Sequence, residues 1–79
     1  MAEPRSIREI ALEISRVWKN VFYGAAPYLK AMHQLNSIQD QYMNDSGKSI
    51  VLYFLSNAAN WRGEDARRIK AELKSLTSQ

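Results

Sequence analysis

The run Ile50–Leu55 (Ile-Val-Leu-Tyr-Phe-Leu) limits the fold of this chain more than any other feature, because it is apolar on nearly every side. Two good helix N-cap residues, Asp45 and Ser46, stand before it. Leu52 and Tyr53 widen its main apolar stripe until few polar positions remain, and such helices usually form the buried centre of a bundle. A short apolar run is also compatible with a strand. We favour a helix, because the apolar pattern continues beyond the run and no second strand is evident to pair with it.

The residues before this run look like the end of a phosphate-binding loop. Gly47-Lys48-Ser49 matches the last positions of the pattern Gly-x-x-x-x-Gly-Lys-Ser/Thr, in which backbone N–H groups surround the phosphates. Tyr42 stands where the first glycine is required, and the segment before the motif is polar and carries no strand signal. We therefore interpret the motif as a helix start, with Gly47 allowing a neighbouring helix to approach closely.

Two amphipathic segments lie on either side of the central run. Ser6 and Glu9 have the spacing of a capping box, and apolar residues then recur at helical intervals. This stripe consists of Ile7, Ile10, Ala11, Ile14, Val17 and Trp18. Towards the other end, Asn60 is a suitable N-cap for another helix. Its apolar side consists of Ala66, Ile69, Leu73 and Leu76. The patterns predict helices over 6–19 and 61–76.

The middle of the chain gives weaker signals. Pro27 fits the first position of a helix, where its missing N–H has no cost, and this predicts a shorter helix near 27–35. The stretch 37–43 is either a short helical turn, with Ser37 and Asp40 as its caps, or an ordered loop.

The predicted fold is therefore all-α, with residues 1–79 forming a single helical domain. It is a compact bundle of three main helices and a shorter helix, joined by a stretch that is either one further turn or an ordered loop. The main helices are predicted at about 6–19, 46–59 and 61–76, the shorter helix near 27–35 and the turn near 37–43. We expect both ends to fray, including the tail 77–79.

The composition excludes several classes of protein. The chain is 79 residues long, 46% hydrophobic and 24% charged, which are ordinary values for a folded domain. It has no cysteine, so neither a disulfide nor a thiolate metal site is available. Its first residues lack the pattern of a signal peptide, and no window has the ~20 apolar residues of a membrane span. We expect a cytoplasmic protein without membrane contact.

The sequence does not point to an enzyme. His33 is the single histidine, and a general base needs a nucleophile or an orienting carboxylate within hydrogen-bond reach. No spacing in the sequence nominates such a group, so we interpret His33 as a partly exposed structural residue. Metal binding would depend on carboxylates alone, and these do not cluster. We therefore expect no catalytic residue, no cofactor and no metal.

Two aromatic residues lie where the helices are expected to connect, namely Tyr23 and Trp61. The simplest interpretation is that a thin core uses large side chains to bury surface. Aromatic residues at such positions also serve as anchors for a partner. Both interpretations stay open.

The last predicted helix has an uneven distribution of charge. Arg67, Lys70 and Lys74 fall on one flank of its apolar stripe, and Arg62 precedes the helix. A row of cations can follow a phosphate backbone, although an ordinary solvated flank looks the same. On the outer side, the Glu64–Arg68–Glu72 series has the spacing of i, i+4 ion pairs.

Residues 49–74, together with Tyr28-Leu29, Met32 and Asp45-Ser46, resemble a segment of small proteins encoded by bacteriophages and prophages. The similarity covers most of the chain. It implies no known activity, and it assigns no functional residue. It implies that binding to a host or phage macromolecule is commoner than catalysis among such proteins.

Two hypotheses of function follow. The first is a protein-binding adaptor or inhibitor, or a homodimer, because Leu12, Leu52 and Tyr23 lie off the main stripes of a chain too small to cover them. The alternative is a nucleic-acid-binding accessory protein that uses the basic flank of the last helix. The residues predicted to contact a partner are Trp61, Arg62, Arg67, Lys70, Lys74 and Tyr23.

Overall fold

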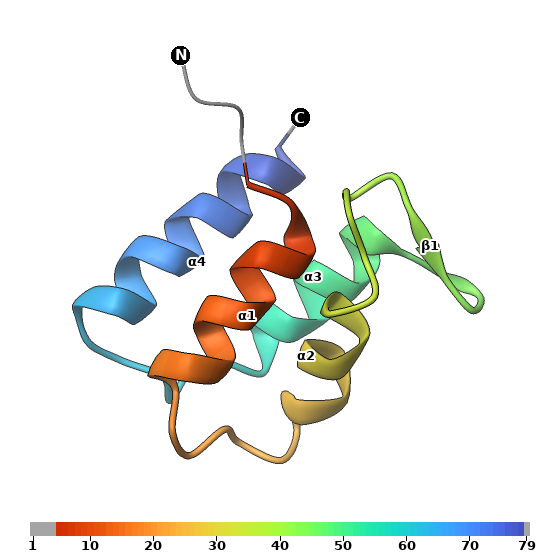
Figure 1. Ribbon diagram of the computed structural model, residues 1–79. Helices are drawn as coiled ribbons and strands as arrows, with labels where there is room; N and C mark the ends of the chain where they lie inside the picture. Colours follow the sequence, from red (N-terminus) through yellow and green to blue (C-terminus); the bar gives the residue numbers. More distant parts are fainter. Residues whose placement is uncertain (1–4, 79) are drawn as a thin grey trace.

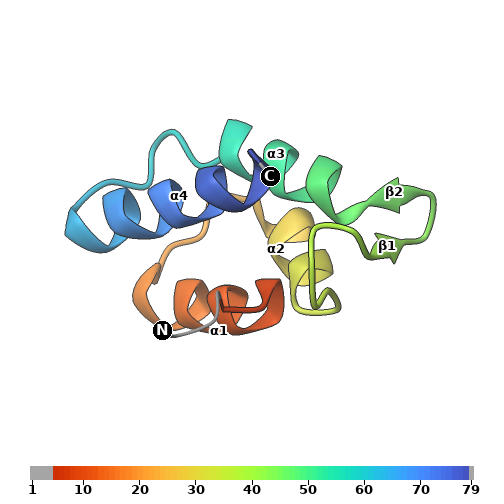
Figure 2. The ribbon, with the colours of Figure 1, turned by 90° about the horizontal axis from the view of Figure 1, so that it is seen from above.

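Four helices surround one apolar core in the computed structural model, which describes residues 5–78 (Figure 1). They are α1 (Ile7–Val17), α2 (Ala26–Met32), α3 (Gly47–Ser56) and α4 (Glu64–Thr77). Each helix contacts the next one along the chain, and α4 also contacts α1, so the four helices close into a ring. Figure 2 shows α1 on one side of the molecule, α3 and α4 on the opposite side, and α2 between them.

The predicted start of α1 is confirmed. Ser6 Oγ accepts a hydrogen bond from the Glu9 N–H (3.1 Å), and the Glu9 carboxylate accepts one from the Ser6 N–H (3.0 Å), which completes the capping box. The helix ends at Val17 rather than at 19, because Trp18 has an extended backbone that turns the chain towards α2. Leu12 lies off the apolar stripe, and its side chain is exposed.

Helix α2 is shorter than the predicted segment 27–35. It begins at Ala26, so Pro27 is its second residue, and it ends at Met32. Leu35 lies beyond the helix but is fully buried. The chain leaves the helix here because the Asn36 carbonyl accepts a hydrogen bond from the Ile7 N–H (3.1 Å), which ties this segment to the start of α1.

A small hairpin follows α2, so the all-α prediction is incomplete. Strands β1 (Gln41–Tyr42) and β2 (Asp45–Ser46) pair antiparallel, with Gln41 opposite Ser46 and Tyr42 opposite Asp45. The hairpin extends away from the helices in both views (Figures 1 and 2). The stretch 37–43 therefore does not form one short helix.

Asp40 organises the turn that precedes the hairpin. Its carboxylate accepts hydrogen bonds from the N–H groups of Asn36 (2.8 Å) and Ser37 (3.2 Å), and its own N–H donates to the Ser37 carbonyl (3.1 Å). Its carbonyl in turn accepts from the Gly47 N–H (2.6 Å). Asp40 thus joins the end of the α2 segment to the start of α3.

The helical interpretation of the apolar run is confirmed, and so is its N-cap. Ser46 Oγ accepts a hydrogen bond from the Ser49 N–H (3.1 Å). Helix α3 ends at Ser56, three residues before the predicted limit. Its burial differs from the prediction, because Leu52 and Tyr53 are 44% and 49% exposed. The helix therefore has an outward face and is not surrounded on all sides.

Gly47 does allow a close approach, but its neighbour is a loop rather than a helix. A Cβ atom at this position would lie 2.7 Å from the Ser37 carbonyl oxygen and 3.1 Å from that of Asp40. Only a residue without a side chain fits against these backbone groups.

Helix α4 begins three residues later than predicted. Its N-cap is Gly63, with φ of 112°, and not Asn60. The helix begins later because the side chain of Trp61 is buried in the core. The backbone N–H of Trp61 donates a hydrogen bond to the Ala58 carbonyl (3.0 Å). At the other end the helix reaches Thr77, which is buried and donates its hydroxyl to the Lys74 carbonyl (3.0 Å). The prediction of a frayed tail is therefore wrong at Thr77, and the predictions for residues 1–4 and 79 lie outside the described residues.

The core takes residues from all four helices and from the connections between them. Its largest fully buried side chains are Phe54, Ile7, Ile10, Ile14, Met32, Leu35, Ile69, Leu73 and Val51. Within residues 5–78, no helix has the length and apolar character needed to cross a membrane.

Candidate interaction surfaces

Trp61 is part of the core, in agreement with the first of the two interpretations of this residue, that of a large side chain that buries surface. It is only 5% exposed, and its indole ring stacks on that of Trp18, with centroids 5.0 Å apart and planes inclined by 9°. Trp18 in turn meets Phe54 edge to face at 6.1 Å. The Trp61 side chain therefore holds the α3–α4 connection against the end of α1.

Lys70 supports this arrangement from α4. Its ammonium group donates a hydrogen bond to the Trp61 carbonyl (2.6 Å) and lies 5.9 Å from the centre of the Trp61 ring. Burial lowers the pKa of Lys70, and the positive charges of Lys74 and Arg62 lower it further. Three of the predicted basic residues therefore lie close together, but Lys70 is engaged in holding the fold.

The opposite flank of α4 faces α1 and carries a network of ion pairs. Glu13 of α1 is its centre, and contacts Arg5 (2.7 Å) and Arg68 (2.8 Å). Arg5 also pairs with Glu72 (2.6 Å), and Arg68 with Asp65 (3.1 Å). The predicted Glu64–Arg68–Glu72 series therefore does not form, because Arg68 reaches across to α1.

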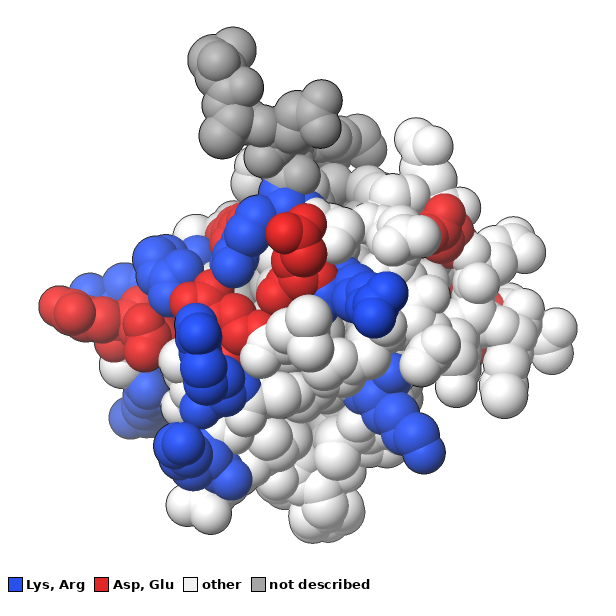
Figure 3. All heavy atoms as spheres, in the orientation of Figure 1, with Lys and Arg blue, Asp and Glu red and all other residues white. Residues whose placement is uncertain are grey.

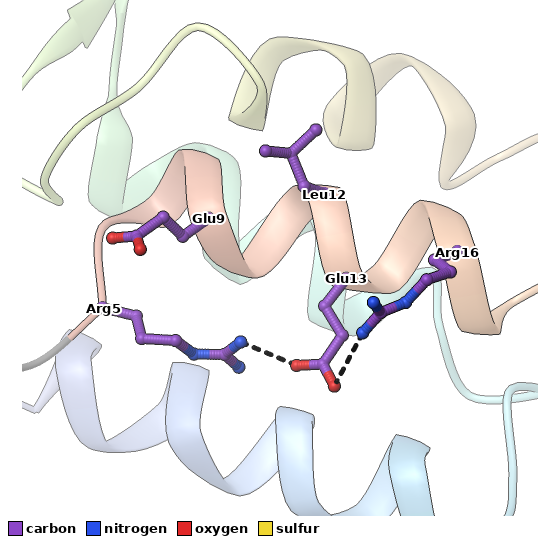
Figure 4. A pocket seen from close by; sticks show the side chains of 5 residues that line it. All are labelled: Arg5, Glu9, Leu12, Glu13 and Arg16. Carbon is purple, nitrogen blue, oxygen red and sulfur yellow. Dashed lines mark ion pairs between the residues drawn. The ribbon is translucent and has the colours of Figure 1, made fainter.

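The two arginines strongly favour the charged form of Glu13. Hydrogen bonds from Arg68 and Arg5 lower the pKa of Glu13 to about 2. Figure 4 shows this carboxylate between Arg5 and Arg16, with α4 below it. The depression drawn there is lined by Arg5, Glu9, Leu12, Glu13 and Arg16. The central charge of this depression, Glu13, is already paired with arginines.

The basic flank of α4 differs from the flank that faces α1. The ion pairs among residues 5–78 use Arg5, Arg16 and Arg68 as their cations. In this described part of the chain, no carboxylate pairs with Arg62, Arg67, Lys70 or Lys74, and all except Lys70 are exposed. The structure thus brings the predicted basic residues together as uncompensated positive charge.

Charge is almost missing from the part of the chain that forms α2, the hairpin and α3. Of the 11 Lys and Arg and the 8 Asp and Glu residues, those between residues 20 and 61 are Lys30, Asp40, Asp45 and Lys48. Figure 3 shows the same division on the face that it displays: charged side chains gather over α1 and α4, and few lie over the hairpin. The exposed large apolar residues of the charge-poor part are Tyr23, Met43, Leu52 and Tyr53.

Aromatic rings lie at the surface of this charge-poor part. Tyr23, predicted as a contact residue, is 83% exposed, and its ring lies 4.7 Å from that of Phe22. The ring of Tyr28 on α2 lies 5.5 Å from that of Tyr53 on α3. Sequence reasoning missed this pair, because helical spacing places Tyr28 on the apolar side of α2 but does not reveal its neighbour on another helix.

One pair of side chains has atoms of the kind used in nucleophilic catalysis. Ser15 Oγ and His33 Nε2 are 2.9 Å apart, between α1 and the end of α2. A catalytic pair also needs a group that orients the histidine and donors that stabilise an oxyanion. Among the described residues, no carboxylate forms a hydrogen bond with His33, so the pair is best explained as a link between two helices.

The described residues contain no group of three or more His, Asp and Glu side chains placed to hold a metal ion. Comparison of the chain with known protein families, with curated proteins and with solved structures gave no match. The surfaces described above are therefore the basis for a proposal about function.

Proposed function

We propose that this protein acts in the cytoplasm by binding another protein, as an adaptor or inhibitor, and that it does not act as an enzyme. The contact surface is the outer side of α2 and α3, with Tyr28, Tyr53 and Leu52 at its centre. The observation that supports this proposal is the coincidence of exposed apolar side chains with missing charge in one half of the molecule.

Protein interfaces have this composition. Their centres are depleted of charged residues and enriched in tyrosine and methionine, whereas charged residues are common on the remaining surface. Tyrosine gives a large contact area at low entropic cost, because it has few rotatable bonds. The resemblance of residues 49–74 to small phage and prophage proteins remains a prediction, and it favours a bacterial or phage macromolecule as the partner.

A second function, binding to nucleic acid, is supported by the uncompensated charge on α4. Arg62, Arg67 and Lys74 are exposed and have no carboxylate partner among residues 5–78. Cations in such a row can neutralise successive phosphates, and the affinity would then fall steeply with salt. Gel shifts at low salt with single- and double-stranded DNA and RNA test this alternative.

The protein-binding proposal is tested by affinity capture from a bacterial lysate with matched variants. Leu52→Ser and Tyr53→Ser should reduce the recovery of a captured protein. Leu12→Ser is the control, because Leu12 is also an exposed leucine but lies on the charge-rich helix α1. Light scattering after size exclusion identifies self-association. If the protein is strictly monomeric and captures nothing, or if the three variants behave alike, the proposal is wrong.

A further inference from the structure

We infer that the partner presents an acidic amphipathic helix, and that this helix lies along the junction between the outer faces of α3 and α4. The inference rests on the proposed protein-binding function, extends its contact surface from the outer face of α3 to the basic flank of α4, and adds the chemistry of the partner. It depends on which residues border that junction, on their charge and on the apolar side chains beside them.

Contacts of α3 show which of its sides faces α4. Tyr53 meets Tyr28, so this side of α3 faces α2. At 100° per residue, Lys48, Leu52 and Leu55 fall on the other side of the buried stripe. Because α3 packs between α2 and α4, these residues border the junction with α4.

Contacts of α4 orient it in the same way. Arg68 and Glu72 pair with residues beside or on α1, so their flank faces α1. Arg67, Lys70 and Lys74 lie on the opposite flank, which faces α3. Lys48 of α3 and the basic flank of α4 therefore border one junction from its two sides.

Cations outnumber carboxylates along this junction, where the acidic residues that are nearest to them in the sequence and form no ion pair among residues 5–78 are Asp45 and Glu64. Lys48, Arg62, Arg67 and Lys74 are exposed, and within residues 5–78 none of them forms an ion pair. The acidic residues of α4 that have partners, Asp65 and Glu72, lie towards α1 and are neutralised there. Carboxylates are thus the complementary groups for this junction, and complementary charges steer a partner into register.

By helical spacing, apolar side chains of α3 lie beside Lys48. Leu52 is exposed and Leu55 is half-buried on the α4 side of α3, and Tyr53 continues the outward face towards α2. A sugar–phosphate backbone offers little apolar surface to cover Leu52, whereas a helix with leucine on one side and glutamate beside it satisfies both kinds of group. Helix-in-groove binding uses this combination of i, i+3, i+4 anchors and flanking charges.

The test uses a fluorescein-labelled synthetic helix of about 18 residues (five turns), with leucine at i, i+3, i+4 and i+7 and glutamate at its flanks. A peptide with lysine in place of every glutamate is the charge control, and a single-stranded oligonucleotide is the nucleic-acid control. Fluorescence anisotropy should show binding of the acidic peptide alone. Raising the salt from about 50 to about 300 mM should weaken binding about tenfold, since exposed charges are screened.

Matched variants locate the site. Lys48→Glu, Arg67→Glu and Lys74→Glu together should weaken binding of the acidic peptide by about tenfold or more, and Leu52→Ser should also weaken it. Arg8→Glu, Lys19→Glu and Lys30→Glu together are the control, because these residues are exposed, form no ion pair among residues 5–78 and lie away from the junction. Circular dichroism of each protein verifies that it is folded.

Several results would overturn the inference. Equal binding of the acidic and basic peptides, or equal effects of the two triple variants, would exclude a charge-selective site. Binding of the oligonucleotide alone, with loss in the first triple variant, would assign the junction to nucleic acid. A captured protein that depends on Leu52 and Tyr53 but not on the three cations would also refute the inference, while the proposed protein-binding function would stand.

Discussion

The indole ring of Trp61 lies flat on that of Trp18, with 5.0 Å between their centroids. The two residues belong to connections that are far apart in the sequence, one after α1 and one before α4. Their contact brings the ends of these helices together, and Lys70 secures it by binding the Trp61 carbonyl. The stack is thus a long-range link between the start of the α1–α2 connection and the α3–α4 connection.

Replacing Trp61 with alanine should remove most of the free energy of unfolding of this protein. Large-to-small changes of buried tryptophan cost about 3–5 kcal/mol, and the total stability of small domains is often only about 5 kcal/mol. Trp61→Phe should cost about half as much, because it keeps an aromatic ring against Trp18. Urea unfolding followed by far-ultraviolet circular dichroism measures both. An alanine variant within 1 kcal/mol of the wild type would show that the stack is dispensable.

Glu13→Gln should weaken the fold at neutral pH and change its response to acid. The pKa of Glu13 is about 2, against 4.5 in the unfolded chain. Its stabilising effect is therefore complete above about pH 4.5 and is lost as the pH falls towards 2. We expect a loss of about 1 kcal/mol at pH 7, because the arginines are partly exposed and solvent screens the pairs.

The measurement for Glu13 is the free energy of unfolding between pH 7 and pH 2. The variant should lose less stability than the wild type between pH 4.5 and pH 2. Glu64→Gln is the control, since Glu64 is exposed and forms no ion pair among residues 5–78. Parallel acid profiles for wild type and Glu13→Gln would contradict the central role of this carboxylate.

Gly47→Ala should destabilise the protein although alanine favours helices. Its Cβ would lie 2.7 Å from the Ser37 carbonyl oxygen, so the turn before the hairpin must move. Forcing atoms into such a contact costs about 1–3 kcal/mol. Thermal unfolding measures the loss, and Lys48→Ala, at the next position on the exposed side, should change the stability by less than about 0.5 kcal/mol. A more stable Gly47→Ala protein would refute the close approach.

Met43→Asn should stabilise the hairpin. Met43 has φ of 57°, and this left-handed conformation costs about 1 kcal/mol for a residue with a side chain, whereas asparagine adopts it more readily. Met43 is 82% exposed, so the substitution gives up little packing. Differential scanning calorimetry should show a higher melting temperature for Met43→Asn and a lower one for Met43→Val, whose branched side chain suits this conformation least. The reverse order would contradict the assigned backbone geometry.

The parts of the fold that could be predicted from the sequence are those set by interactions between residues close together in the chain. The capping box of Ser6 and Glu9 and the N-cap Ser46 need only residues three positions apart, so their spacing is visible in the chain. The hairpin was missed because its strands have two residues each, too few for an alternating pattern. Its turn at Met43 also lacks the Asn-Gly or Asp-Gly sequence that usually marks a two-residue hairpin loop.

The candidate surfaces were predicted in part, for a similar reason. The flank with Arg67 and Lys74 follows from helical spacing alone, and Tyr23 is exposed. The burial of Trp61 depends on Trp18, which is more than forty positions earlier in the sequence. The pairing of Arg68 with Glu13 likewise joins two helices. Such long-range contacts are set by the packing of the ring and not by any local pattern.

The burial of the two tryptophans also divides the optical signals of this protein. The chain has 2 tryptophans, and both lie in the core stack, whereas Tyr23 and Tyr53 lie at the surface. Tryptophan emission will therefore report whether the domain is folded, with little response to a partner at the outer side of α3. Fluorinated tyrosine, observed by ¹⁹F resonance, will report contact there. Folding and recognition can thus be followed separately in one sample.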